Sequence, residues 1–97
     1  MNVPEIEELK KLCKELGEKE LIVRIDSFVA LNEGLVSKKG KEFIEVSVLG
    51  FAEGVLTTLT AKYPGNKRVL GLLERVRSRR EELDSLFRKP KPPIFEG

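Results

Sequence analysis

Hydrophobic positions recur at helical spacing along most of this chain, and their period predicts four helices. The predicted helices cover about residues 4–16, 20–33, 41–62 and 67–87. Gly17 and Gly34 follow the first two helices, and the turn residues 63–66 separate the last two. We therefore expect an all-α, four-helix-bundle-like single domain over residues 1–87, followed by a Lys/Pro-rich C-terminal tail over residues 88–97.

The second apolar stretch also permits a strand. The run Ile22-Val23-Arg24-Ile25 is rich in β-branched side chains, which favours extended structure. The alternative fold is therefore α+β, with paired strands near residues 21–25 and 43–48. The length of the stretch favours the helix, and a stripe of small residues that begins at Ser47 has a helical period.

The predicted helix 41–62 has two distinct faces. The first is a broad apolar face made of Ile44, Val48, Phe51, Ala52, Val55 and Leu59. The second carries only small side chains, namely Ser47, Gly50, Gly54, Thr57, Thr58 and Ala61. A glycine inside a helix costs about 1 kcal/mol relative to alanine, and small side chains let another backbone approach closely. We therefore expect this helix to be buried on two sides, with the small residues as the candidate protein interface.

Composition narrows the class of protein. The chain has 97 residues, of which 40% are hydrophobic and 35% charged, which suits one folded domain. No apolar run reaches the roughly 18 residues that span a bilayer, and no secretory signal is visible. The one cysteine, Cys13, lies on the apolar stripe of the first helix, where we expect a small core side chain. These features predict a cytoplasmic protein without membrane attachment.

Several residue types are missing. The chain has no histidine, tryptophan or glutamine, and it is rich in lysine, arginine and glutamate, a composition typical of thermophilic proteins. The absence of histidine removes the commonest general base and the commonest transition-metal ligand. With one cysteine, a single chain cannot build a tetrahedral Cys/His zinc site. We therefore expect a protein that is not an enzyme and that has neither a cofactor nor a bound metal.

Basic residues gather in the C-terminal third. Residues 67–91 carry nine Lys/Arg and four Asp/Glu, a net charge of +5, which raises the question of nucleic-acid binding. The arginines, however, are spread around the predicted helix, and Arg77–Glu81 and Arg80–Asp84 have the i,i+4 spacing of ion pairs. An ion-paired surface is therefore favoured over a nucleic-acid site.

The turn before the last predicted helix is a candidate anion site. Asn66 is placed to cap the helix, and Lys67 and Arg68 follow at a helix start, where cations are disfavoured unless an anion is bound. Together with the backbone amides of Gly65 and Asn66, these two cations would form a small anion cradle.

Two pairs of carboxylates have the spacing of metal ligands on a helix. Glu42 and Glu45 form one pair, and Glu81 and Asp84 form the other. This arrangement is similar to that of the helical nucleotide pyrophosphatases, in which two such pairs hold magnesium. The resemblance implies a magnesium-dependent enzyme, which we keep as a third interpretation because the same spacings arise on solvated helix faces.

A wider resemblance involves the run Gly50-Phe51-Ala52-Glu53-Gly54 and the turn Tyr63-Pro64-Gly65. With this composition, the chain resembles small uncharacterised proteins of hyperthermophilic archaea, a resemblance that implies no activity and no site residues. The leading hypothesis is a helical protein–protein interaction or oligomerisation module, with a homodimer as the candidate assembly. The alternative is an anion- or nucleic-acid-binding protein that uses the basic C-terminal third.

Overall fold

The computed structural model describes residues 3–87 of the chain. Its helices are α1 (Pro4–Glu15), α2 (Lys19–Glu33), α3 (Val36–Lys39), α4 (Lys41–Lys62) and α5 (Lys67–Phe87). The all-α prediction is confirmed, and the four long helices begin and end within one residue of the predicted bounds. The α+β alternative is wrong, because residues 21–25 lie inside α2 and residues 43–48 lie inside α4. The predicted tail over residues 88–97 lies outside the described part of the chain.

The ends of the helices have local causes. Pro4 occupies the first turn of α1, where its missing amide hydrogen costs nothing, and Gly17 follows the helix with φ +74°. At the start of α5, Asn66 Oδ1 accepts hydrogen bonds from the amides of Arg68 at 3.0 Å and Val69 at 3.1 Å. The predicted N-cap is therefore present, and Gly65 supplies the positive φ of +83° that the preceding turn requires.

The connection between α2 and α4 is partly helical. Within residues 35–40, Val36–Lys39 forms the single helical turn of α3. Gly40, with φ +93°, then redirects the chain into α4. Just before this connection, the buried side chain of Asn32 donates a hydrogen bond from Nδ2 to the Phe28 carbonyl oxygen at 2.8 Å.

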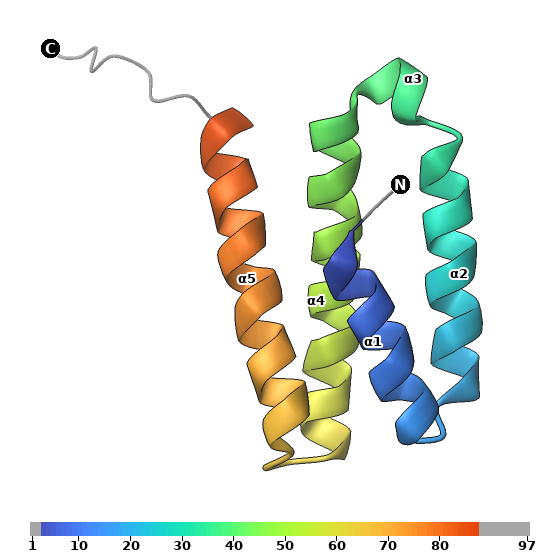
Figure 1. The fold of residues 1–97 in the computed structure, drawn as a ribbon, viewed down its shortest axis with the longest axis vertical. Helices are drawn as coiled ribbons and strands as arrows, with labels where there is room; N and C mark the ends of the chain where they lie inside the picture. The colour runs from blue at the N-terminus through green and yellow to red at the C-terminus, as the bar shows by residue number, and fades with distance from the viewer. Residues whose placement is uncertain (1–2, 88–97) are drawn as a thin grey trace, which may run out of the picture.

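The helices form two unequal layers. Figure 1 shows α2, α4 and α5 side by side, with the shorter α1 lying across one side of α4, between α2 and α5. The chain runs in opposite directions in α4 and α5, as the short turn between them predicts, and also in α2 and α4. Among the described residues, no helix lies on the side of α4 away from α1, and the shortest extent of the molecule is 17 Å.

The hydrophobic core fills the space between α1 and the layer of long helices. Its fully buried members include Leu9, Ile25, Ile44, Leu49, Leu56, Leu59, Val69 and Val76. Cys13 is also fully buried, and this burial raises the pKa of its thiol to about 11. The predicted role of Cys13 as a core side chain is confirmed, and its thiol stays protonated at neutral pH.

Candidate interaction face

The small residues of α4 lie on its uncovered side. Gly54, Thr57, Thr58 and Ala61 are exposed, whereas Ser47 and Gly50 are half-buried; we call these six residues the small-residue stripe. The large apolar residues of α4 pack against the core on the opposite side. Among the described residues, α1 covers one side of α4 and no helix covers the other, so burial of the small-residue side stays a prediction that requires a partner.

The two glycines of the stripe are not required by contacts within the described chain. A Cβ atom added at Gly54 would meet nothing within 4 Å, and one added at Gly50 would meet only Arg80 Cδ at 3.8 Å, an ordinary contact. Each glycine weakens the helix by about 1 kcal/mol relative to alanine. The close approach that would explain these glycines is thus absent among residues 3–87.

Both threonine hydroxyls of the stripe are hydrogen-bonded. Thr57 Oγ1 donates to the Glu53 carbonyl oxygen at 2.8 Å, and Thr58 Oγ1 donates to the Gly54 carbonyl oxygen at 3.2 Å. Because each of these hydroxyls bonds to its own helix, burying the two threonines would leave neither donor without a partner. An apolar surface can therefore cover the two threonines at little polar cost.

An apolar groove lies beside the stripe, between α2 and α4. It has a volume of about 350 Å³ and is lined by Val23, Arg24, Ser27, Phe28, Leu31 and Phe51. Its floor is the stacked pair of Phe28 and Phe51, and its rim includes Val23 and Leu31, which are 64% and 69% exposed. Together, the small-residue stripe and the apolar groove form what we call the open face.

Other apolar side chains are exposed near the open face. Phe43 lies on the same side of α4 as the stripe, near the N-terminal end of the helix and one turn before Ser47. Lys39 Nζ lies 5.6 Å from the centroid of the Phe43 ring. On α5, the exposed Leu70 is seven residues from Arg77, so both lie on one side of that helix. Phe43 and Leu70, with Val23 and Leu31, are the exposed large hydrophobic residues of the described chain. Side chains of this kind gather at protein interfaces.

The helix α4 is apolar and only partly buried. Among the described helices, it is the one long and apolar enough to cross a membrane by length and composition, a test that core helices of soluble proteins also pass. Of its most apolar 18-residue window, 39% is buried. The other residues of the window are half-buried or exposed, and the exposed ones include Gly54, Thr57 and Thr58.

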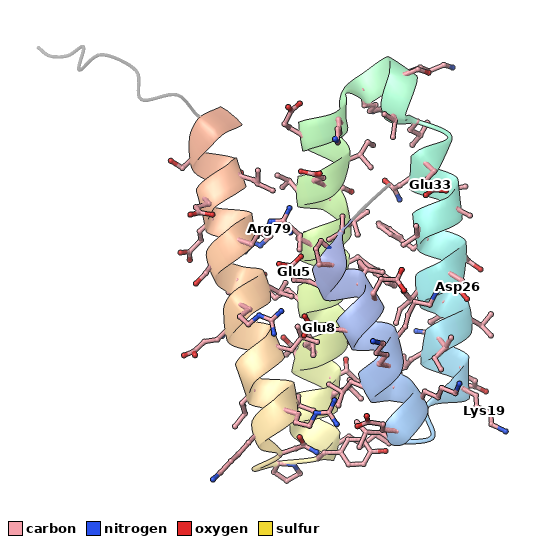
Figure 2. All side chains as sticks on the ribbon, viewed as in Figure 1. Glu5, Glu8, Lys19, Asp26, Glu33 and Arg79 are labelled. Carbon is pink, nitrogen blue, oxygen red and sulfur yellow. The ribbon has the colours of Figure 1, made fainter. Side chains whose placement is uncertain are left out.

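Ion pairs tie α5 to α1 on the covered side. Arg79 Nη1 lies 2.5 Å from Glu5 Oε1, and Figure 2 shows these side chains pointing toward one another. Arg75 forms a two-pronged pair with Glu8, at 2.8 and 2.5 Å, which lowers the pKa of the Glu8 carboxyl. The guanidinium groups of this side are therefore engaged within the chain, which leaves less free positive charge for a nucleic acid.

Two arginines of α5 share one glutamate of α4. Arg77 Nε lies 2.9 Å from Glu53 Oε2, and Arg80 Nε lies 2.8 Å from Glu53 Oε1 without the alignment of a hydrogen bond. The Arg77 hydrogen bond is the main cause of the lowered pKa of the Glu53 carboxyl. Arg77 and Arg80 thus both pair with an acid of another helix, in addition to any acid that the i,i+4 spacing within α5 offers.

The candidate anion cradle is largely occupied by the chain. The Asn66 amide donates to the Tyr63 carbonyl oxygen at 3.2 Å, and the Arg68 amide donates to the Asn66 side chain. The guanidinium of Arg68 pairs with Glu15, while Lys67 is exposed. Two of the groups expected to hold an anion, the Asn66 amide and Arg68, thus have other partners, and the anion site stays a prediction.

The carboxylate pairs do not form a metal site. Within residues 3–87, no group of three or more Cys, Asp and Glu side chains lies close enough to hold a metal ion. The described residues therefore supply no ligand set built from Glu42, Glu45, Glu81 and Asp84.

The groove is a feature that the helical spacing did not predict. The helical stripe of α2 that points to the core contains Phe28 and Ile25, and it leaves Val23 and Leu31 on the opposite side. Apolar residues that fall off a core stripe were the signal that could have identified this surface. The position of Phe51 beside Phe28 could not be read from spacing, because it depends on how α2 packs against α4.

Over residues 3–87, the fold is all-α and leaves an apolar surface uncovered by any described helix. A family model described as "Protein of unknown function (DUF3216)" matches residues 6–97, and the chain belongs to this family. The structure is similar to the "Crystal structure of a singleton protein PF1176 from P. furiosus", with a TM-score of 0.79 and 38% sequence identity. That similarity covers 87% of this chain and 91% of the other. No curated protein gives a significant match.

Proposed function

We propose that this protein is a helical interaction module that associates with a second copy of itself through the open face. The observation that carries the proposal is the pair of mid-helix glycines, Gly50 and Gly54, on an uncovered side of α4 where nothing in the described chain requires a glycine. A second backbone lying on the stripe would supply the missing close contact.

The surroundings of the stripe support the same function. The groove beside it is almost wholly apolar, and the exposed Val23 and Leu31 would gain from burial. Removing apolar surface from water contributes about 25 cal/mol per Å², so a contact over stripe and groove together is favourable. No catalytic chemistry is assigned in this proposal; its function is association.

The test uses two glycine variants that add the same side chain. In Gly54→Leu, the new side chain grows from a Cβ position that has no described atom within 4 Å, and it would stand between two associating helices. In the control Gly71→Leu, the same change is made on α5 in the cleft beside Arg75, where a Cβ also meets nothing within 4 Å. Both variants gain helix propensity, so neither is expected to unfold.

The mass of each protein in solution is then measured by light scattering after gel filtration, with circular dichroism as a check on folding. We expect the unchanged protein and Gly71→Leu to be dimers and folded Gly54→Leu to be a monomer. A dimer of unchanged affinity in Gly54→Leu, or a monomer in the unchanged protein at every concentration, would overturn the proposal.

A further inference from the structure

Resting on the proposed function, the geometry points to one arrangement of the two copies. We infer that they pair with their α4 helices antiparallel, about a two-fold axis that crosses α4 at Ala52 and α2 at Ser27. In this arrangement the α2 helices of the two copies also face each other, and the interface uses the same residues from both sides.

The residues of α4 are arranged symmetrically about Ala52. The pairs Phe43 and Ala61, Ser47 and Thr57, and Gly50 and Gly54 each lie at equal distances before and after that residue. When the α4 helices of two copies cross antiparallel at the level of Ala52, each residue of one copy meets the other member of its pair in the second copy. The large Phe43 then lies against the small Ala61 of the second copy, and glycines face each other near the crossing, where the backbones are closest.

A parallel pairing would use the same surface poorly. Each residue would then meet its own equivalent, so that one end of the interface would hold two Phe43 rings and the other end two Ala61 methyl groups. The rings would hold the helices apart and leave the alanine end underpacked, which costs free energy. The order of large and small residues therefore favours the antiparallel arrangement.

The exposed row on α2 has the same centre. Val23 and Leu31 lie four residues on either side of Ser27, and all three line the groove. The rings of Phe28 and Phe51 stack with centroids 4.2 Å apart, which fixes the register of the two antiparallel helices. Because the two helices are antiparallel, the residue before Phe28 lies at the level of the residue after Phe51. Ser27 is therefore at the level of Ala52. One straight axis can therefore pass through both centres, and Val23 then meets Leu31 of the second copy.

The area of the face suits a stable dimer. A helix of 22 residues such as α4 is about 33 Å long, and three helices packed side by side are about 28 Å wide. The whole uncovered side of α2, α4 and α5, of which the open face is a part, is therefore on the order of 900 Å². A standard protein interface buries about 800 Å² per partner, so most of this side would take part in the dimer.

Charges near the axis do not oppose this pairing strongly. Arg77 lies on α5 close to the same level, since it reaches Glu53, the residue after Ala52. It enters the interface beside Glu53, which it shares with Arg80, so the charge of Arg77 is partly neutralised within each copy.

The inference is tested by cysteine cross-linking in the full chain under mild oxidation. Ser27→Cys places a thiol on the proposed axis, where it meets its own equivalent within the reach of a disulfide. Ser47→Cys places one five residues from the centre of α4, so that its equivalent is about 15 Å away. Ser78→Cys, in the trough beside Glu5 and Arg79 on the covered side, is the control, and the buried Cys13 contributes no background.

We expect Ser27→Cys to form a covalent dimer on the order of ten times faster than Ser47→Cys or Ser78→Cys. A mixture of Ser47→Cys and Thr57→Cys proteins should cross-link faster than either protein alone. Rapid self-linking of Ser47→Cys without that of Ser27→Cys, in a protein that is a dimer by mass, would overturn the antiparallel arrangement and leave the proposed function standing.

Other occupants of the groove give different results. A monomer in which the Ser27→Cys thiol is shielded from a maleimide would assign the groove to the chain's own residues 88–97, and it would overturn both proposals. A monomer in which the same thiol reacts freely, with cross-linking no faster than in the Ser78→Cys control, would likewise overturn both.

Discussion

The ring of Phe28 lies on the ring of Phe51, with centroids 4.2 Å apart and an angle of 5° between their planes. This stack joins α2 to α4 at the floor of the apolar groove. It therefore couples the stability of the fold to the shape of the surface that we propose for association.

Replacing Phe51 with alanine should weaken both the fold and the proposed association. The ring is half-buried, so we expect a loss of about 2 kcal/mol in the free energy of unfolding, roughly half the cost of removing a fully buried phenylalanine. Urea unfolding of Phe51→Ala and of the milder Phe51→Leu measures this loss. An Ala variant as stable as the unchanged protein would show that the stack does not hold α2 in place.

Alanine should have opposite effects at two of the glycines. At Gly54 the helix is regular and a Cβ meets nothing, so Gly54→Ala should raise the stability of the chain by about 1 kcal/mol. At Gly65 the backbone has φ +83°, so Gly65→Ala should lower stability by about 1 kcal/mol or more. Thermal unfolding of the two variants gives the sign of each effect, and a destabilised Gly54→Ala monomer would contradict the account of the stripe.

Removing the cap of α5 should cost a measurable amount. Asn66 Oδ1 accepts hydrogen bonds from two amides at the helix start, and Asn66→Ala leaves both to water. We expect a loss of about 1 kcal/mol, with Asn66→Asp close to neutral because an aspartate also caps a helix. Chemical denaturation of the two variants distinguishes a lost cap from a general effect of changing the turn.

Acid should destabilise the fold before base does. Hydrogen bonds and ion pairs lower the pKa values of the Glu8, Glu18 and Glu53 carboxyls below their usual range. A group with a lowered pKa stabilises the fold above its unfolded pKa, about 4.3 for glutamate, and loses that contribution as the pH falls through its folded pKa. Because the chain has no histidine, we expect stability to change little between about pH 6 and pH 8.

The pH prediction is checked by measuring the melting temperature from pH 2 to pH 9. The variant Glu53→Gln, which removes the carboxylate shared by Arg77 and Arg80, should melt at a lower temperature at neutral pH and lose less on acidification. We expect the difference at pH 7 to be about 1 kcal/mol or less. A steep loss of stability between pH 6 and pH 8 would point to a titrating group that the structure does not identify.

Local sequence patterns predicted the helices. The contacts between helices and the uncovered side of α4 depend on tertiary packing, which those patterns do not determine. The caps and turns at Gly17 and Asn66 act through neighbouring backbone atoms, so their positions could be read from the sequence. The partner of Arg77 could not be read from the sequence. The i,i+4 spacing considers only acids on the same helix, whereas Glu53 lies on α4. The uncovered state of Gly54 depends on which side of α4 the short α1 occupies, which helical spacing leaves open.

The central claim is that the open face holds a second copy of the chain, and sedimentation equilibrium of the unmodified protein tests it most directly. Run over a wide range of concentrations beside Gly54→Leu, the unmodified protein should have about twice the mass of one chain, falling toward a single chain on dilution. Gly54→Leu should keep the mass of one chain throughout. A single-chain mass for both proteins at every concentration would contradict the account.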